Sequence, residues 1–277
     1  MNEVKVGIIG IGNMGSAHLR MITGGNIPDM TVTAVCDIDT EKLNAARNTY
    51  PALRVFEDYT DLLKNSDTNA VIIAVPHPLH AKIAIEAFEY GKHVLVEKPI
   101  DITVSAAEKL CAAARKSGKV FAVMFNQRTN GLFREARRIV NSGELGELKR
   151  SVWIITNWYR TQSYYDSGSW RATWRGEGGG VLLNQAPHNL DIWQWICGSP
   201  SAVTAFCSVG KFHNIEVEDE ATIYAEYENG ATGVFITSTG DCPGTNRLEI
   251  TGTRGKLVLE NGILKLWKLN EDERDIC

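Results

Sequence analysis

Short apolar runs alternate with amphipathic stretches over the first 125 residues. Five of the runs are rich in β-branched residues and have the pattern of buried parallel strands: residues 4–9, 31–36, 71–75, 93–96 and 120–125. Helices are predicted at residues 16–22, 78–90 and 105–117, and another follows Thr40, its predicted N-cap. Strands that alternate with helices at this spacing predict an α/β fold with a doubly wound parallel sheet.

The pattern changes after about residue 126. A helix, a long strand and a second helix are predicted first, at residues 132–141, 148–157 and 183–196. Predicted strands with tight turns then follow at residues 201–209, 219–227, 231–238, 246–251 and 256–260. Asn229-Gly230 and Asn261-Gly262 are typical of hairpins. This half therefore predicts a second, α+β domain with a large, mostly antiparallel open sheet.

Length, composition and charge limit the classes of function. At 277 residues the chain exceeds a typical single domain, and its apolar fraction of 44% is ordinary for a globular protein. A net charge of −4 without Lys/Arg runs predicts no nucleic acid and no membrane-surface partner. No apolar run is long enough to span a bilayer, and the N-terminus lacks a signal-peptide pattern. The six cysteines have no metal-binding spacing and fit a reducing compartment, so we expect a cytoplasmic protein.

A glycine-rich turn lies between the first predicted strand and the first predicted helix. Glycines permit a tight turn and a close approach of the backbone to a ligand, and the helix N-terminus offers N–H donors to a pyrophosphate. A GxGxxG pattern alone is a weak signal, but this one has the strand before it and the helix after it. We therefore predict a dinucleotide site that includes Gly10, Gly12, Asn13, Met14 and Gly15.

Asp37 ends the second predicted strand, 22 residues after Gly15. A carboxylate at this distance can accept hydrogen bonds from the adenosine ribose, and it would repel a 2′-phosphate. No arginine follows it directly. These features favour NAD over NADP as the cofactor, and a solvated strand end is the alternative interpretation of Asp37.

Two further motifs carry groups suited to proton transfer. Glu97-Lys98-Pro99 follows the fourth predicted strand, and His188 lies within a cluster at residues 178–191. Imidazole titrates near neutral pH, and a lysine ammonium can polarise a substrate oxygen or, where burial favours its neutral form, exchange a proton. A core histidine and a surface lysine are the structural alternatives. Together with a dinucleotide, these residues predict a hydride-transfer enzyme.

With these motifs and the segment Val75-Pro76-His77-Pro78-Leu79-His80, the chain resembles the Gfo/Idh/MocA oxidoreductase family of glucose–fructose oxidoreductase and inositol dehydrogenase. The resemblance covers the whole chain. It implies an NAD-binding Rossmann domain at residues 1–125 and an α+β substrate-binding and oligomerisation domain at residues 126–277. It also implies homodimers or homotetramers formed through the C-terminal sheet. The implied activity is NAD(P)-linked oxidation or reduction of a ring hydroxyl on a sugar, glycoside or cyclitol.

The resemblance implies roles for particular residues. Lys98 and His188 would share the catalytic proton transfer, and the Lys98–Pro99 peptide bond is expected to be cis. Relatives often carry Asp four residues before the motif histidine, where Asn184 stands here; Asn184 can orient His188 or hold a substrate hydroxyl. Asp191 is expected to be a structural or orienting group and not a catalyst. Relatives also continue for several dozen residues beyond this chain, so we expect a shortened protein or a fragment.

Further contacts are predicted around the expected cleft. Cofactor contacts are predicted for Pro76, His80, Glu97, Lys98 and Asn126. Substrate contacts are predicted for Lys98, Arg128, Trp170, Arg171, Arg175, Asn184 and His188. Aromatic faces stack on the C–H faces of sugars, and sheet core or a subunit interface is the alternative for the aromatic stretch at residues 158–174. His77 and His80 have no third ligand, so no metal is predicted.

The sequence therefore predicts an NAD-dependent dehydrogenase that acts on CH–OH groups of a small sugar or cyclitol. Two alternatives stay open. One is a glycosidase that uses tightly held NAD in a redox-neutral reaction. The other is a sugar or nucleotide sensor without turnover, for which Asn184 and the short C-terminus are the supporting features.

Overall fold

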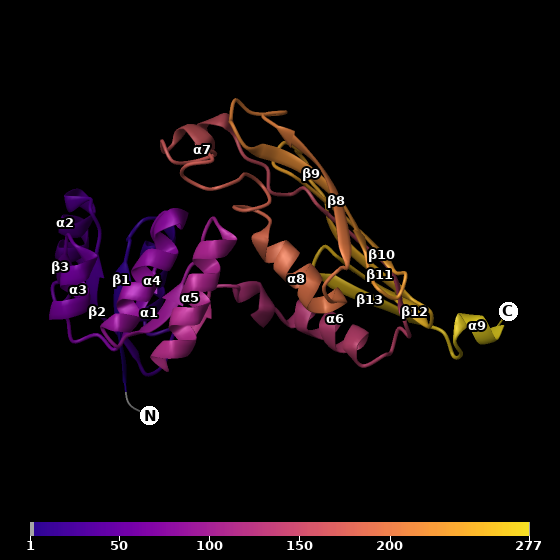
Figure 1. Ribbon diagram of the computed structural model, residues 1–277, viewed down its shortest axis with the longest axis horizontal. Coiled ribbons are helices and arrows are strands. Elements are labelled where there is room, and N and C mark those ends of the chain that lie inside the picture. The colour runs from indigo at the N-terminus through magenta and orange to yellow at the C-terminus, as the bar shows by residue number, and fades with distance from the viewer. Residues whose placement is uncertain (1–2, 277) are drawn as a thin grey trace. The chain divides into compact units, whose positions relative to one another are not determined.

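The computed structural model describes residues 3–276, and the chain divides into two compact units (Figure 1). The first unit ends at Met124 and the second begins at Phe125, one residue before the predicted boundary. Each unit has its own sheet and its own hydrophobic core. Over residues 3–276, no helix is long and apolar enough to cross a membrane.

The first unit contains a doubly wound parallel sheet, as predicted. Its described residues form six strands in the order β3-β2-β1-β4-β5-β6, and every neighbouring pair is parallel. The strands are β1 (Val4–Ile9), β2 (Met30–Cys36), β3 (Arg54–Phe56), β4 (Ala70–Ile73), β5 (His93–Val96) and β6 (Phe121–Val123). Strand β3 was not predicted, because three residues are too few to show a period.

Helices cover both faces of this sheet. They are α1 (Asn13–Thr23), α2 (Thr40–Thr49), α3 (Tyr59–Asn65), α4 (His80–Glu89) and α5 (Val104–Ser117), with a 3₁₀ turn η1 (His77–Leu79) before α4. Leu19 of α1 and Leu43 of α2 pack into one core. Leu62 of α3, Ile83 of α4 and Leu110 of α5 pack into the other. The sheet is therefore buried on both faces, which explains why its strands are mostly apolar.

The N-cap of α2 differs from the predicted one. Asp39, not Thr40, caps the helix, and its carboxylate accepts hydrogen bonds from the backbone N–H groups of Glu41 and Lys42 at 3.0 and 3.4 Å. A side-chain oxygen at the N-cap satisfies amides that the helix itself leaves unpaired. Thr40 is therefore the first helical residue and not the cap.

The second unit is built on a mostly antiparallel sheet, as predicted. In the part that the structure describes, seven strands have the order β13-β12-β11-β7-β10-β9-β8, and only β7 and β10 pair in parallel. The strands are β7 (Leu148–Ile155), β8 (Ala202–Val209), β9 (Glu218–Glu226), β10 (Thr232–Ser238), β11 (Asn246–Gly252), β12 (Gly255–Glu260) and β13 (Ile263–Lys268). Strand β13 was not predicted; it completes the hairpin that Asn261-Gly262 indicates.

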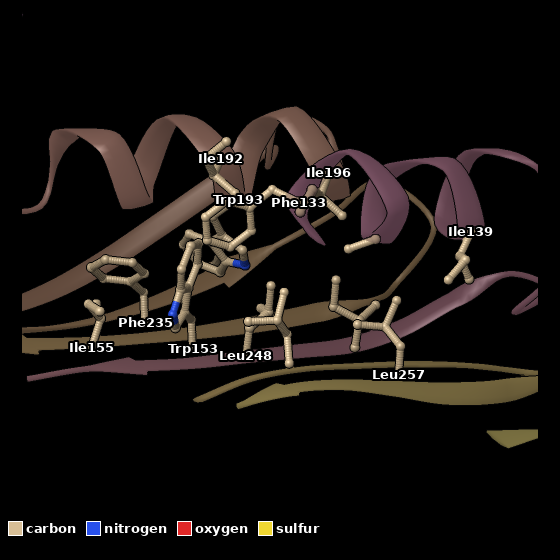
Figure 2. Close-up of a cluster of buried hydrophobic side chains, with 14 of the residues drawn as sticks. Phe133, Ile139, Trp153, Ile155, Ile192, Trp193, Ile196, Phe235, Leu248 and Leu257 are labelled. Atoms are coloured by element: carbon tan, nitrogen blue, oxygen red, sulfur yellow. The ribbon is translucent and has the colours of Figure 1, made fainter. Parts of the chain in front are cut away.

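Helices α6 (Gly131–Asn141) and α8 (Pro187–Cys197) pack on one face of the second sheet. Figure 2 shows side chains of both helices directed at the strands, with Trp193, Trp153 and Phe235 close together. Trp193 stacks on Phe235 with ring centroids 5.5 Å apart, and its indole N–H donates to Ser151 Oγ at 2.9 Å. Trp153 is fully buried, so this aromatic residue belongs to the core and not to a ligand site.

The segment between β7 and α8 carries several of the predicted substrate residues. It contains the short helix α7 (Gln162–Asp166). Helix α8 begins at Pro187 and not at residue 183 as predicted, since proline suits the first helical turn and residues 181–186 form turns. Asn184 therefore precedes the helix, and His188 is its second residue. The remaining described helices are η2 (Asn126–Thr129) and α9 (Glu273–Ile276).

Candidate functional site

Close backbone approaches fix the glycine turn between β1 and α1. A Cβ atom on Gly15 would lie 1.8 Å from the carbonyl oxygen of Gly10, and one on Gly10 would lie 2.5 Å from that of Ala74. Gly10 also has a φ of +88°, which favours glycine. At Gly12, the N-cap of α1, a Cβ would meet no described atom within 4 Å apart from its chain neighbours. Gly12 therefore faces open space beside the N-terminal amides of α1, where a phosphate can bind.

A pocket of about 530 Å³ lies beside this turn. It is lined by Ile11, Gly12, Asn13, Ser16, Arg20 and Lys42. Two of these side chains are cationic, and the positive end of the α1 dipole adds to them. The pocket includes the predicted Gly12 and Asn13, and it fits the phosphates of a dinucleotide.

Asp37, directly after β2, is fastened to the glycine turn. Its Oδ2 accepts the backbone N–H of Ile11 at 2.8 Å, and its Oδ1 accepts that of Asp39 at 3.0 Å. The ammonium of Lys42 lies 3.9 Å from Oδ1. Each carboxylate oxygen has a second lone pair, so these hydrogen bonds orient the group and leave it able to accept from a ribose. Its predicted role toward the ribose stays a prediction.

Glu97 connects the Lys98 segment to α1. Its Oε1 lies 2.7 Å from Nε2 of His18, and its Oε2 accepts the backbone N–H of Lys98 at 3.2 Å. The Glu97 and His18 side chains are both buried. The Lys98–Pro99 peptide bond is cis, which confirms the expectation.

The carboxylate of Glu97, which was predicted to contact the cofactor, thus hydrogen-bonds to other groups of the same chain. His18 was not predicted as a site residue. The signal that could have found it is a histidine on the apolar side of an amphipathic helix, four residues before another buried position, Ile22.

His80 is fully buried, with 0% of its surface exposed. Its Nδ1 lies 2.7 Å from the carbonyl oxygen of Pro99, and its Nε2 lies 2.8 Å from that of Val75. Both ring nitrogens thus face backbone oxygens inside the protein, and the predicted cofactor contact of His80 stays a prediction. Burial lowers the pKa of His80, and the two carbonyl oxygens oppose that shift. His80 joins the segment after β4 to the segment after β5.

The other predicted residues near β4 take up structural positions. Pro76 is the N-cap of η1, and His77 is buried, with its ring centroid 5.8 Å from that of His80. Among residues 3–276, no group of three or more His, Cys, Asp or Glu side chains is placed to hold a metal ion.

Asn184 and His188 lie on either side of the start of α8. The backbone N–H of Asn184 donates to the carbonyl oxygen of Gly180 at 2.9 Å, and its side-chain amide donates to the carboxylate of Glu177. Glu177 is buried and was not predicted as a site residue. The His188 ring meets Phe125 edge to face, with centroids 5.8 Å apart.

Arg128 and Asp191 form a bidentate ion pair. The guanidinium donates from Nε to Oδ2 at 2.8 Å and from NH2 to Oδ1 at 2.6 Å. This pair joins η2 to α8, so Asp191 has the structural role that was expected of it. The carboxylate also raises the pKa of Arg128. Asn126, the first residue of η2, is exposed, and its carbonyl oxygen accepts the hydroxyl of Thr129.

In the aromatic loop before α8, Arg171 contacts two aromatic rings. Its guanidinium carbon lies 4.6 Å from the ring centroid of Trp170 and 4.6 Å from that of Tyr164. It also donates to the Tyr164 hydroxyl at 2.9 Å. Trp170 and Arg171 are half-buried, whereas Arg175 is exposed. The loop thus presents an arginine already oriented by aromatic faces.

Two family models match the chain. The model described as "Oxidoreductase family, NAD-binding Rossmann fold" matches residues 4–125, and the model "GFO/IDH/MocA C-terminal domain" matches residues 133–258. The chain belongs to the Gfo/Idh/MocA oxidoreductase family. The resemblance that the motifs predict is confirmed, and the first unit of this Gfo/Idh/MocA protein is an NAD-binding Rossmann domain.

Similar proteins include oxidoreductases from several bacteria. The uncharacterized oxidoreductase YrbE of Bacillus subtilis is 29% identical over 266 residues, which cover 94% of this chain and 74% of YrbE. Levoglucosan dehydrogenase of Pseudarthrobacter phenanthrenivorans is 27% identical, over 93% of this chain and 74% of that enzyme. Inositol 2-dehydrogenase of Salmonella typhimurium is 34% identical over 146 residues, which cover 52% of this chain and 43% of that enzyme. This last match thus spans less than half of the relative.

Solved structures show the same fold. The WlbA dehydrogenase from Chromobactrium violaceum, in complex with NADH and UDP-GlcNAcA, superposes with a TM-score of 0.90 at 27% identity. The superposition covers 98% of this chain and 79% of the WlbA chain. Levoglucosan dehydrogenase in complex with NADH and levoglucosan has a TM-score of 0.84 at 25% identity. That superposition covers 99% of this chain and 78% of the levoglucosan dehydrogenase chain.

Proposed function

We propose that this Gfo/Idh/MocA protein is an NAD-dependent dehydrogenase that transfers a hydride between nicotinamide and a ring hydroxyl of a sugar, glycoside or cyclitol. The placement of Lys98 carries the proposal. Lys98 follows β5 at the carboxyl edge of the parallel sheet, the edge that also carries the glycine turn, and Glu97 ties it to His18 of α1. Ligands of doubly wound sheets bind at that edge.

The cofactor would be held by the glycine turn and Asp37. The amides at the start of α1 would bind the pyrophosphate, and the oriented carboxylate of Asp37 would accept from the adenosine ribose. Its negative charge favours NAD over NADP. When bound, the nicotinamide supplies the acceptor or donor of hydride.

Lys98 and His188 would share the proton transfer at the substrate oxygen. When a hydroxyl is oxidised, its proton must leave the oxygen as the hydride leaves the carbon. A lysine ammonium can polarise that oxygen, whereas a neutral imidazole or a neutral lysine amine can take up the proton. Asn184 would orient His188 or the substrate hydroxyl. Trp170, Arg171, Arg175 and Arg128 would contact the sugar ring and its substituents, with Arg171 already aligned by Tyr164.

The two alternatives gain no support from the similar proteins. The inositol and levoglucosan relatives are named dehydrogenases, and the neighbouring structures that hold a sugar-type ligand also hold NADH. We therefore keep the redox-neutral glycosidase and the sensor only as outcomes of the test below.

The test measures NADH absorbance when the purified chain meets NAD and pooled cyclitols, sugars and glycosides. We expect a rise that both Lys98→Ala and His188→Ala abolish, while Lys109→Ala, at an exposed position of α5, leaves it unchanged. A folded chain that binds NAD but gives no rise with any pool would overturn the proposal. It would then favour the glycosidase if a glycoside is cleaved, or the sensor if it is not.

We also propose that the chain forms homodimers or homotetramers through the face of the second sheet opposite α6 and α8. Phe206, Thr222, Ile236 and Ile154 pair across β8, β9, β10 and β7, so their side chains lie on that one face. Phe206 is 74% exposed. An exposed apolar face of this kind fits a subunit interface.

A further inference from the structure

A buried carboxylate lies beside the proposed catalytic turn. Glu177 is only 1% exposed. Its Oε2 accepts the backbone N–H of Ala172 at 2.7 Å, and its Oε1 accepts the side-chain amide of Asn184. Both partners are donors, which is the pattern of an ionised carboxylate. Glu177 thus joins the loop of Trp170 and Arg171 to the turn before α8.

This contact fixes which way the Asn184 amide points. A carboxylate only accepts hydrogen bonds, so the NH₂ group of Asn184 must face Glu177. Its carbonyl oxygen is then the opposite end of the amide, an acceptor by nature. An acceptor at this position can receive a hydrogen bond from an imidazole N–H or from a substrate hydroxyl.

The same contact also locates a negative charge. Position 184 itself is neutral, because asparagine carries no charge. Here the charge lies on Glu177, one hydrogen bond away from position 184. The neighbouring buried carboxylate, Glu218 of β9, is committed to the backbone N–H groups of Gly180 and Leu182 at 2.9 and 3.1 Å. Glu218 therefore holds the glycine run.

We propose that Glu177 is a positioning residue of the active site: it fixes the orientation of the Asn184 amide and supplies, one hydrogen bond away, a negative charge beside the neutral position 184. The proposal rests on the proposed dehydrogenase function. It also assigns Glu177 a second task, because its hydrogen bond to Ala172 holds a residue with a φ of +50° in the loop that carries Trp170 and Arg171.

A double-substitution cycle tests this arrangement. In Glu177→Gln, one acceptor oxygen must serve two donors, so either Ala172 loses its partner or the Asn184 amide turns round. In Asn184→Asp, two carboxylates face each other, and their like charges repel unless one of them binds a proton. In the double variant, the glutamine oxygen can accept from Ala172 while its NH₂ group donates to Asp at 184. The double variant therefore keeps a hydrogen bond to the Ala172 N–H and one to the side chain at position 184, and it moves the charge to position 184.

We expect each single variant to lower kcat by about tenfold or more while the KM for NAD changes little, and the double variant to recover to within about threefold of the natural chain. Glu216→Gln is the matched control, since exposed Glu216 accepts the backbone N–H of Trp174 in the same loop, and a glutamine oxygen can still do so. Its kcat should match that of the natural chain. Two results would overturn the proposal: a Glu177→Gln variant with unchanged kcat, or a double variant as impaired as the singles.

A second readout does not depend on turnover. The protonation of His188 is followed by NMR in the chain with labelled histidine, with His188→Gln used to assign its signal. If the Glu177 charge acts on His188 as proposed, Glu177→Gln should lower the pH at which His188 titrates, because a negative charge favours the imidazolium. The double variant should restore that pH, and an unchanged titration in Glu177→Gln would contradict the role of Glu177. If the natural chain makes no NADH, the dehydrogenase proposal fails, while this titration still decides the proposal for Glu177.

Discussion

At the scale of single residues, two glycines of the same turn do different things. Gly15 lies against the protein's own backbone, with its Cβ position 1.8 Å from the carbonyl oxygen of Gly10. Gly12 has an ordinary φ of −67° and open space at its Cβ position among the described atoms. The first glycine is therefore required by the fold, whereas the second is available to a ligand.

Alanine substitutions should separate these two roles. Gly15→Ala should destabilise the protein by more than about 3 kcal/mol, because the backbone must move to admit the methyl group. Gly12→Ala should leave the melting temperature nearly unchanged and weaken NAD binding by about tenfold or more. Thermal melts and NAD titrations check both. A Gly12→Ala variant that binds NAD normally would contradict the placement of the pyrophosphate at this turn.

Asp37 should decide between the two cofactors. Asp37→Asn keeps one acceptor oxygen for the Ile11 amide but loses the charge and the acceptor for Asp39. We expect the preference for NAD over NADP, measured as the ratio of kcat/KM values, to fall by about tenfold or more. Glu41→Gln, exposed in the first turn of α2, is the control and should keep the natural ratio. An unchanged ratio in Asp37→Asn would show that the carboxylate does not meet the ribose.

At the scale of elements, two buried histidines hold the Lys98 segment in place. His18 brings α1 to Glu97, and His80 brings the start of α4 to the carbonyl oxygens of Val75 and Pro99. Asp101 adds a hydrogen bond from the backbone N–H of Ala81 at 3.3 Å. The proposed catalytic lysine thus follows strand β5, and hydrogen bonds join the segment after this strand to helices α1 and α4.

Burial of His80 should make stability depend on pH. Its pKa in the folded chain is below the ordinary value of 6.5, so as the pH falls below that value the unfolded chain binds the proton first. The contribution of neutral His80 to the stability of the folded chain is present above about pH 6.5 and is lost as the pH falls. In His80→Gln, whose NH₂ group can donate to the same carbonyl oxygens without titrating, the melting temperature should fall less steeply with acidification. Equal slopes in the two proteins would contradict this account.

The periodicity of apolar residues, together with glycines and prolines at the ends of elements, was enough to predict most helices and strands. It was not enough to predict the parts that depend on contacts between distant residues. The short strand β3 and helix α3 give no clear period, and the start of α8 was placed too early because the glycine run looked like the helix start and Pro187 was not used. The predicted roles of Lys98 and Asp37 rest on motifs with a local geometry. His18 and Glu177 were missed, since their hydrogen bonds reach 79 and 7 residues along the chain and follow no repeat.

At the scale of the whole molecule, the second sheet carries helices on one face and exposed apolar side chains at its β8 edge. Trp153 and Phe235 point to the helix-covered core, whereas Phe206 belongs to the other face. Val203 at the same edge is also 62% exposed. An exposed apolar edge strand makes a monomer prone to aggregate, so a partner subunit is a more favourable neighbour for this strand than solvent.

A charge on this face should weaken subunit association. Phe206→Glu places a carboxylate in the proposed interface, so light scattering coupled to size exclusion should report a smaller mass than that of the natural chain. Lys109→Glu changes the charge at an exposed position of α5, outside the proposed interface, and should leave the mass unchanged. A natural chain that is monomeric at all concentrations tested would contradict the proposed interface.

The most direct test of the central claim follows the hydride itself. The chain is incubated with NADH deuterated at the reactive carbon of the nicotinamide and with pooled ketones derived from sugars and cyclitols, and the products are analysed by mass spectrometry. We predict an alcohol product that carries a single deuterium on the former carbonyl carbon, and its loss in Lys98→Ala. Alcohol products without the label, or no product from a folded chain that binds NADH, would contradict hydride transfer between nicotinamide and a ring hydroxyl.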